Sequence, residues 1–462
     1  MNRSRSINKE MLKLALPSIL ANITVPLVGM VDIAVAGHIS SAATGVSHIE
    51  SATLIGGIAI GTMIFDLLYW NFGFLRVGTG GLTAQAYGRA DFKECRDIFT
   101  RAIGIALASA FTFILLQWFI VQFAFLFIEC SPEVKALASK YFYIRILAAP
   151  ATLSLMAFKG WFIGMQDSVS PMVTDLVVNL VNAVASIIMA LGIGSWNGIG
   201  FAGIAWGTVI AQYSGLISAL LFFSIKYWKK TYSGVSPKEF ANAFKGEGTS
   251  KFFTMNIDLV VRSLSFIGIY IGFTLIAARF GDLLLAVSSI MMKLLLLFSY
   301  VTDGFAYAGE AMTGKYIGKQ DRAGLRSTVK YTFLWSAGIC IVFMAIYKFC
   351  GEWLLELMTS DRNVIEACAP YMVWLFFMPL TGCAAFTWDG IFLGATASKE
   401  ARNSTLFATI GFLATYFISA AIMHPSNVTA VHLLLAAYFV HLLIRSLTLT
   451  ICYRKAVLSR VP

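Results

Sequence analysis

One carboxyl group, that of Asp32, stands inside the apolar stretch TVPLVGMVDIAVAG at residues 24–37. A charge near the centre of a bilayer costs at least about 2.5–3.5 kcal/mol, so an ionisable residue within a membrane span is a candidate for ion coupling or substrate binding. Pro26, six residues earlier, has no backbone N–H and its ring crowds the carbonyl of Asn22. The helix is therefore expected to kink or break beside Asp32. The alternative role of Asp32 is to pair with a structural partner.

A polar face follows in the stretch DLVVNLVNAVASIIMA, where Asn179, Asn182 and Ser186 have the spacing i, i+3, i+7. Residues at this spacing share one side of a helix. Thr208, in the next apolar stretch, can join them. Hydrogen bonding between helices would explain any one of these residues. Together with Asp32 they predict a small polar cavity in the first half of the chain.

The second half carries further acids within or near apolar stretches: Asp258, Asp303, Glu310 and Asp389. Asp303 and Glu310 share a helical face at i+7 and are secondary candidates for lining a central space. Asp258 precedes Arg262 by four residues, which favours a structural ion pair between them. Asp389 is expected to cap a helix or to pair near one membrane face. Arg76, on the second apolar stretch, is expected to pair with one of the acids.

The elements that must position these residues are membrane helices. Hydrophobic residues make up 58% of the 462-residue chain and charged residues 13%. Apolar runs of about 20 residues, the length that crosses the hydrocarbon core as a helix, recur along the whole chain. The sequence therefore predicts an all-α integral membrane protein with twelve spans: 10–37, 51–77, 98–128, 136–163, 168–194, 200–224, 252–278, 284–309, 329–357, 364–394, 403–423 and 428–452.

The net charge of +11 follows the topology of these spans. Lys and Arg gather before the first span and after the second, sixth, eighth, tenth and last, whereas the other loops carry few. By the positive-inside rule both termini are cytoplasmic, and the first apolar segment is a retained span. This placement explains the basic excess without nucleic-acid binding. We expect a multi-pass protein of the bacterial inner membrane that contacts lipid and functions as a monomer.

Motifs for enzyme chemistry are missing from the sequence. The seven cysteines form no CxxC pair, and the five histidines form no HExxH motif. No GxSxG or phosphate-binding loop is present. We therefore expect no enzyme, no cofactor and no metal site.

An internal repeat organises the chain at an offset of 230 residues. TAQAYGRADFKECR at 83–96 aligns with TGKYIGKQDRAGLR at 313–326, and KGWFIGMQDS at 159–168 aligns with DGIFLGATAS at 389–398. Both members of each pair follow an even-numbered span, so the sequence predicts two parallel six-helix bundles: an N-lobe (1–225, helices 1–6), a cytoplasmic linker (226–251) and a C-lobe (252–462, helices 7–12). Such a pair of bundles is typical of transporters, although a repeat can also be kept for packing alone.

Several segments make a family resemblance specific: LALPSILANITVPLVGMVDIAVAGH, FLRVGTGGLTAQAYG, DGFAYAGEAMTGKYIG and WDGIFLGATASKEARNS. They resemble the DinF-like branch of the multidrug and toxic compound extrusion (MATE) family, from about residue 8 to residue 455. The resemblance implies a two-lobed antiporter that exports amphipathic, often cationic compounds by alternating access. It places Asp32 on the first-helix carboxylate that exchanges substrate for the coupling ion, with Asn182 and Thr208 beside it.

The chain departs from many relatives at Ser186, where the fifth helix of the family carries a second carboxylate. A sodium site needs several hard oxygen ligands, and loss of a charged ligand weakens it more than it weakens protonation of one buried acid. The sequence therefore favours protons over sodium as the coupling ion. The other readings are a sodium-coupled exporter, a flippase of lipids or lipid-linked glycans with a more basic cavity, and a membrane enzyme or scaffold.

Overall fold

The computed structural model describes residues 2–38, 51–233, 239, 242–245, 247–359, 361–423 and 427–462. Its described residues are almost entirely helical, and no β-strand is present among them beyond an isolated bridge between Ile193 and Trp196. Within the described ranges, eleven helical segments are long and apolar enough to cross a membrane. Helix α1 (Asn2–His38) adds a twelfth, because 37 residues exceed the length that a span requires. The predicted all-α membrane class is confirmed.

In the first half, α1 is followed by segments in which short helices join end to end. The bounds are α2 (Ser51–Trp70), η1 (Asn71–Gly73), α3 (Phe74–Gly88), α4 (Phe92–Ala124), α5 (Pro132–Arg145), η2 (Ile146–Ala148), α6 (Ala149–Gly164), α7 (Val169–Leu191), α8 (Phe201–Lys226) and α9 (Trp228–Thr231). The second and fourth predicted spans each contain a short 3-10 turn, η1 or η2.

The second half begins with α11, which starts at residue 247 and not at the predicted 252. The bounds are α11 (Glu247–Ala278), α12 (Asp282–Gly318), α13 (Arg322–Phe349), α14 (Gly351–Met358), α15 (Arg362–Cys368), η3 (Ala369–Tyr371), α16 (Met372–Gly394), α17 (Ser398–Met423), α18 (Asn427–Ala456) and η4 (Leu458–Arg460). The ninth predicted span, 329–357, is wrong at its end: the helix stops before Cys350, whose φ of −117° is not helical, and α14 begins as a separate helix.

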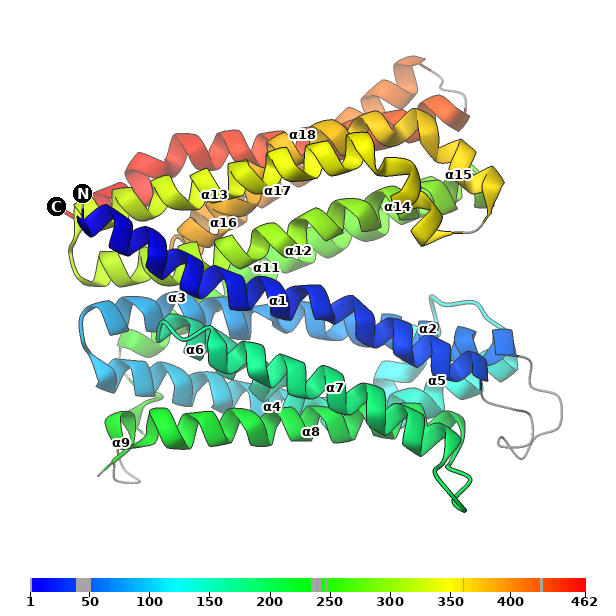
Figure 1. Cartoon of the computed structure of the whole chain (residues 1–462), viewed down its shortest axis with the longest axis horizontal. Helices are drawn as coiled ribbons and strands as arrows, with labels where there is room; N and C mark the ends of the chain where they lie inside the picture. Colours follow the sequence, from blue (N-terminus) through cyan, green and yellow to red (C-terminus); the bar gives the residue numbers. More distant parts are fainter. Residues whose placement is uncertain are drawn as a thin grey trace.

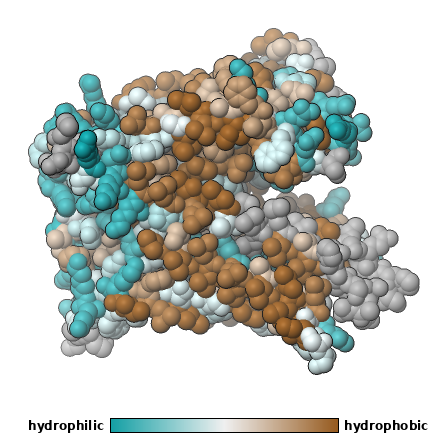
Figure 2. Space-filling view, viewed as in Figure 1, coloured by the Kyte–Doolittle hydropathy of each residue, from teal (hydrophilic) through white to brown (hydrophobic). Residues whose placement is uncertain are grey.

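The long helices run side by side along the longest axis of the molecule (Figure 1), with both termini at the same end. Helices of the first half lie on one side and those of the second half on the other, and α1 packs against both α7 and α12. Apolar residues form a broad band across the molecule, and hydrophilic residues gather at the end with the termini (Figure 2). Two termini at one end agree with an even number of spans. Their cytoplasmic location stays a prediction.

The predicted repeat is visible in the backbone. Among the described residues, four that are not glycine have a positive φ: Ala90 and Gln320, and Gln166 and Thr396. The members of each pair are 230 residues apart. The repeat extends to the next position, because the Asp91 carboxylate caps α4 and the Asp321 carboxylate caps α13. Each half therefore uses the same left-handed turn and acidic N-cap to start its third long helix.

Residues related by the repeat also touch each other across the two halves. A Cβ atom added at Gly88 would lie 2.2 Å from the Lys315 carbonyl oxygen and 3.0 Å from the Gly318 Cα. The Gln85 side chain donates to the Gly394 carbonyl at 3.0 Å, which joins α3 to α16. Near the termini the halves are thus in backbone contact, whereas a notch separates them at the opposite end (Figure 2).

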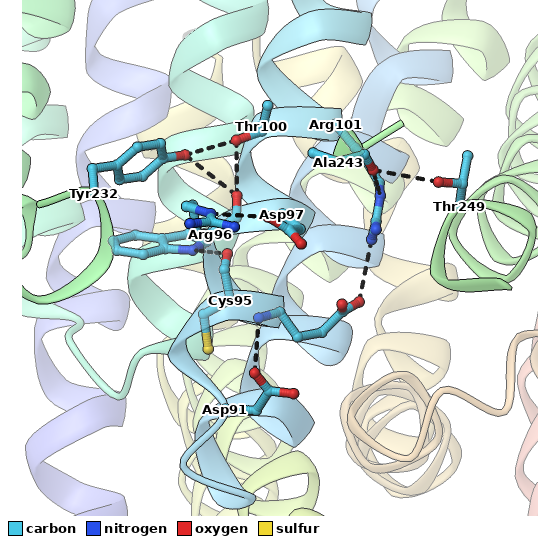
Figure 3. A network of polar contacts seen from close by, with 11 residues as sticks. Asp91, Cys95, Arg96, Asp97, Thr100, Arg101, Tyr232, Ala243 and Thr249 are labelled. Carbon is cyan, nitrogen blue, oxygen red and sulfur yellow. Dashed lines mark hydrogen bonds and ion pairs between the residues drawn. The ribbon is translucent and has the colours of Figure 1, made fainter. Parts of the chain in front are cut away.

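The segment between the halves is held against the start of α4 (Figure 3). The Arg101 guanidinium donates to the Ala243 carbonyl at 2.5 Å, and the Thr249 hydroxyl shares this acceptor at 3.4 Å. The hydroxyls of Thr100 and Tyr232 are 2.9 Å apart. The connection between the halves is therefore docked on the first half through side-chain hydrogen bonds.

Candidate functional site

The polar cluster of the first half depends on close packing between α7 and α8. A Cβ at Gly207 would lie 2.6 Å from the Ser186 backbone, so only glycine allows this approach. The next residue, Thr208, then lies where its hydroxyl accepts from the Asn182 side-chain amide at 3.1 Å. The side-chain carbonyl oxygen of Asn182 is buried and has no hydrogen-bond partner among the residues that the structure describes. This oxygen is a free acceptor for a cation or for a donor group of a substrate.

Asp32 on α1 faces the same cluster. The Ser186 hydroxyl donates to Asp32 Oδ1 at 3.3 Å, and the exposed fractions of the two residues are 7% for Asp32 and 0% for Ser186. Within the described part of the chain, no Lys or Arg forms an ion pair with Asp32. A buried carboxyl group with one neutral donor is poorly stabilised as an anion, so a proton or a cation can neutralise it.

Asn179 ties the outer part of the cluster to α1. Its amide donates to the Thr24 hydroxyl at 2.7 Å, two residues before Pro26. The side chain of Pro26 lies outside the described residues, but the backbone of α1 is assigned as one helix from Asn2 to His38. The predicted break at Pro26 is therefore not present in this conformation. A bend within the continuous helix stays a prediction.

An arginine that sequence reasoning missed lies near Asp32. The Arg145 guanidinium donates to the hydroxyls of Thr62, at 3.3 Å, and Tyr141, at 3.1 Å, and its carbon is 4.8 Å from the centre of the Phe65 ring. It attracts Asp32 electrostatically, and within the described ranges it forms no ion pair. Arg145 stands inside the fourth predicted span, so its position within an apolar stretch was the available signal.

The secondary candidates lie at the junction of the two halves. Glu310 on α12 is 1% exposed and pairs with Arg76 on α3 at 3.4 Å. The Arg76 guanidinium carbon is 4.2 Å from the centre of the Tyr307 ring. Asp303, two helical turns before Glu310 on α12, accepts from the Ser299 hydroxyl at 3.4 Å. The predicted pairing of Arg76 with an acid is confirmed, and this ion pair joins the halves.

The predicted pair between Asp258 and Arg262 is wrong. Asp258 accepts from Arg402 at 2.5 Å and from Ser398 at 2.8 Å, both on α17. Arg262 pairs with Asp389 on α16 at 2.6 Å. Spacing of i, i+4 permits a pair on one helix, but the partners offered by neighbouring helices decide which pair forms.

Asp389 also binds Arg445 of α18, so this one carboxylate serves two guanidinium groups. Sequence reasoning missed Arg445 and a second pair, Lys159 with Asp175 at 2.7 Å, which links α6 to α7. All of these residues lie in apolar stretches, where an ionisable residue indicates a functional site or a structural ion pair. Which charges meet depends on the packing of the helices.

The Asp389 cluster yields a stability prediction. Asp389→Asn leaves Arg262 and Arg445, whose side chains are 12% and 3% exposed, facing each other without a counter-charge. Breaking a buried pair in this way costs about 3–5 kcal/mol of unfolding free energy, which denaturant titration in detergent measures. As a control, Lys226→Gln removes the pair with Asp167, in which the lysine side chain is 40% exposed, and should cost less than about 1 kcal/mol. Equal costs for the two variants would contradict a structural role for Asp389.

Comparisons with known proteins match nearly the whole chain. The MatE family model matches residues 17–188 and 259–417. The DNA damage-inducible protein F of Escherichia coli is 32% identical over 450 residues, which cover 97% of this chain and 93% of that protein. A probable multidrug resistance protein NorM of Photorhabdus laumondii is 24% identical over 404 residues, 86% of this chain and 84% of that protein.

The fold is that of solved transporters as well. A multidrug resistance MATE family transporter in an outward-facing conformation superposes with a TM-score of 0.82 at 16% identity, covering 99% of this chain and 97% of that one. At this identity the likeness shows the fold alone. The family model and the extent of the match to the Escherichia coli protein carry the assignment: this chain belongs to the MatE family, the multidrug and toxic compound extrusion family of membrane transporters.

Proposed function

We propose that the protein is a secondary antiporter that exports amphipathic, cationic compounds in exchange for protons, and that Asp32 carries the exchange. The observation that supports this role most directly is the burial of Asp32 with a single neutral donor, Ser186, and without an ion pair among the described residues. By contrast, Asp175, Asp258 and Asp389 each have a basic partner within 4 Å. Asp32 is thus a carboxyl group free to exchange one cation for another.

The side-chain oxygen of Asn182, which has no partner among the described residues, adds a second feature of the site. It lies one helical turn from Ser186 and can accept from an ammonium group or another donor of the substrate. A proton on Asp32 removes the negative charge that would attract such a cation. Proton uptake and substrate release are therefore opposed at one carboxyl group, which is what antiport requires.

The contact pattern supports alternating access. The halves touch through Gly88 and Gly318 near the termini and part at the other end (Figure 2). If the termini are cytoplasmic, the notch faces outward. Transport would require the halves to rock until the contact near the termini opens.

Coupling to protons predicts efflux in the absence of sodium. Purified protein in liposomes should drive a cationic dye uphill when a pH gradient is imposed in sodium-free buffer, because only one carboxylate, Asp32, is present in the cluster. The measurement is dye accumulation with pH and sodium gradients imposed separately. A strict sodium requirement would show that the coupling ion is sodium.

Restoring a second acid should change the ion preference. The Ser186 hydroxyl oxygen lies 3.3 Å from Asp32 Oδ1, so Ser186→Asp places two carboxyl groups in one buried site. A sodium ion between the two carboxylates would relieve their repulsion. We expect sodium to stimulate efflux by this variant about tenfold or more, while proton-driven efflux shifts to higher pH. Ser186→Asn is the uncharged control. Sodium independence of the Ser186→Asp variant would exclude a cation site between residues 32 and 186.

A flippase of anionic lipids is the second candidate, because Arg145 brings a positive charge close to the cluster and forms no ion pair with any described residue. Arg76 and Lys159 also lie in apolar stretches, but each is paired with an acid. Liposomes that contain a fluorescent anionic lipid distinguish the candidates. Lipid translocation without dye efflux would favour the flippase.

A further inference from the structure

A basic pocket lies between α11, the start of α17 and the C-terminal segment. Its volume is about 510 Å³. Four cationic and two acidic side chains line it: Lys251, Lys399, Arg402, Arg460, Asp258 and Glu400. We refer to this cavity as the basic pocket.

The charges of the basic pocket do not cancel. Asp258 is already neutralised by Arg402, at 2.5 Å. In the described part of the chain, Lys251, Lys399 and Arg460 form no ion pair. Glu400 is the other acid that lines the pocket, and Glu94 also attracts Lys251, which Arg460 and Arg89 repel. Four cationic and two acidic side chains leave the pocket with an excess of positive charge.

The two helices that line the pocket also carry exposed apolar side chains. On α17, Arg402, Leu406 and Ile410 share one face at i+4 steps, and Leu406 and Ile410 are 37% and 62% exposed. On α11, which packs beside α17, Ile257 and Leu264 are 62% and 53% exposed. Exposed apolar side chains on helices long and apolar enough to cross a membrane suit contact with acyl chains.

We propose that the basic pocket binds the phosphate group of an anionic phospholipid, whose acyl chains lie along α11 and α17. Arginine and lysine donors form strong charge-assisted hydrogen bonds with phosphate, and basic pockets near the membrane surface bind anionic head groups. Charges that serve only to orient the chain need no common cavity, since each can be hydrated separately. A soluble phosphate compound shares the head-group chemistry, but it would gain nothing from Leu406 and Ile410.

The test uses the full chain in detergent micelles with added phosphatidylglycerol or phosphatidylcholine. The pocket variant carries Lys251→Gln, Lys399→Gln and Arg460→Gln. The control variant carries Lys229→Gln, Lys319→Gln and Lys455→Gln, which remove the same charge from exposed lysines outside the pocket. Native mass spectrometry counts bound lipid, and thermal unfolding without lipid checks that each variant is folded.

The expected result is retention of phosphatidylglycerol over phosphatidylcholine by the unaltered protein, with affinity for phosphatidylglycerol reduced about tenfold or more in the pocket variant only. Binding should weaken at high salt, because the attraction is electrostatic. An equal loss in the control variant would overturn the proposal in favour of general surface charge. Displacement of the lipid by millimolar inorganic phosphate or glycerol 3-phosphate would overturn the proposal that the ligand is a lipid, and would favour a soluble phosphate compound.

Discussion

Asp32→Asn is expected to abolish coupled efflux, to the level of liposomes without protein, while the protein folds normally. The substitution keeps the shape of the side chain and an oxygen that accepts from Ser186, 3.3 Å away. It removes the only group of this cluster that can alternate between a negative and a neutral state. Because coupling requires that alternation, loss of the charge should remove uphill transport. The measurement is dye accumulation driven by a pH gradient.

The sharpest control for this variant is Asp66→Asn. Asp66 is a second carboxyl group of the first half that Arg145 attracts, so its removal changes the same electrostatic surroundings. Among the described residues it forms no hydrogen bond with Ser186, and it is exposed on α2. Efflux by Asp66→Asn should stay within about twofold of wild type. Uphill efflux by Asp32→Asn at the wild-type rate would show that Asp32 is structural.

Gly88→Val should have the second large effect, because it places a side chain where α3 and α12 touch. A Cβ there would lie 2.2 Å from the Lys315 carbonyl oxygen, and backbone atoms cannot rotate away as a side chain can. Overpacking of this kind costs about 1–3 kcal/mol, which shifts an equilibrium between two states by about 5–150-fold. We expect the halves to part near the termini and efflux to fall about tenfold or more.

Spin labels measure that separation directly. In a cysteine-free background, labels at Lys93→Cys and Ala323→Cys report the distance between equivalent, exposed positions of the two halves. The distance should increase in Gly88→Val. Gly268→Val is the matched control, because among the described residues no atom outside the local turns of its own helix lies within 4 Å of a Cβ added at Gly268. Unchanged distance and efflux in Gly88→Val would mean that this contact does not separate during transport.

The sequence by itself determined the fold class, the number of spans and the repeat. Long apolar runs have few outcomes in a bilayer, since backbone polar groups must be satisfied within each helix. The repeat could be recognised in the sequence because the same turn recurs in both halves. Asp91 and Asp321 cap equivalent helices, and each follows a residue with a positive φ, Ala90 or Gln320. Helical spacing also placed Asn182 and Ser186 on one face of α7, as the structure has them.

Only the tertiary structure decided which charges meet. Asp258 pairs with Arg402 on α17 and not with Arg262 on its own helix, and Arg262 pairs with Asp389 on α16. Sequence spacing describes neighbours on one helix, whereas an ion pair in the membrane forms wherever two helices bring opposite charges within reach. The same packing gave Asp32 a hydroxyl as its partner and left it without a basic one among the described residues. Residue spacing along one helix cannot predict the partner of Asp32, because that partner depends on how closely α1, α7 and α8 approach each other.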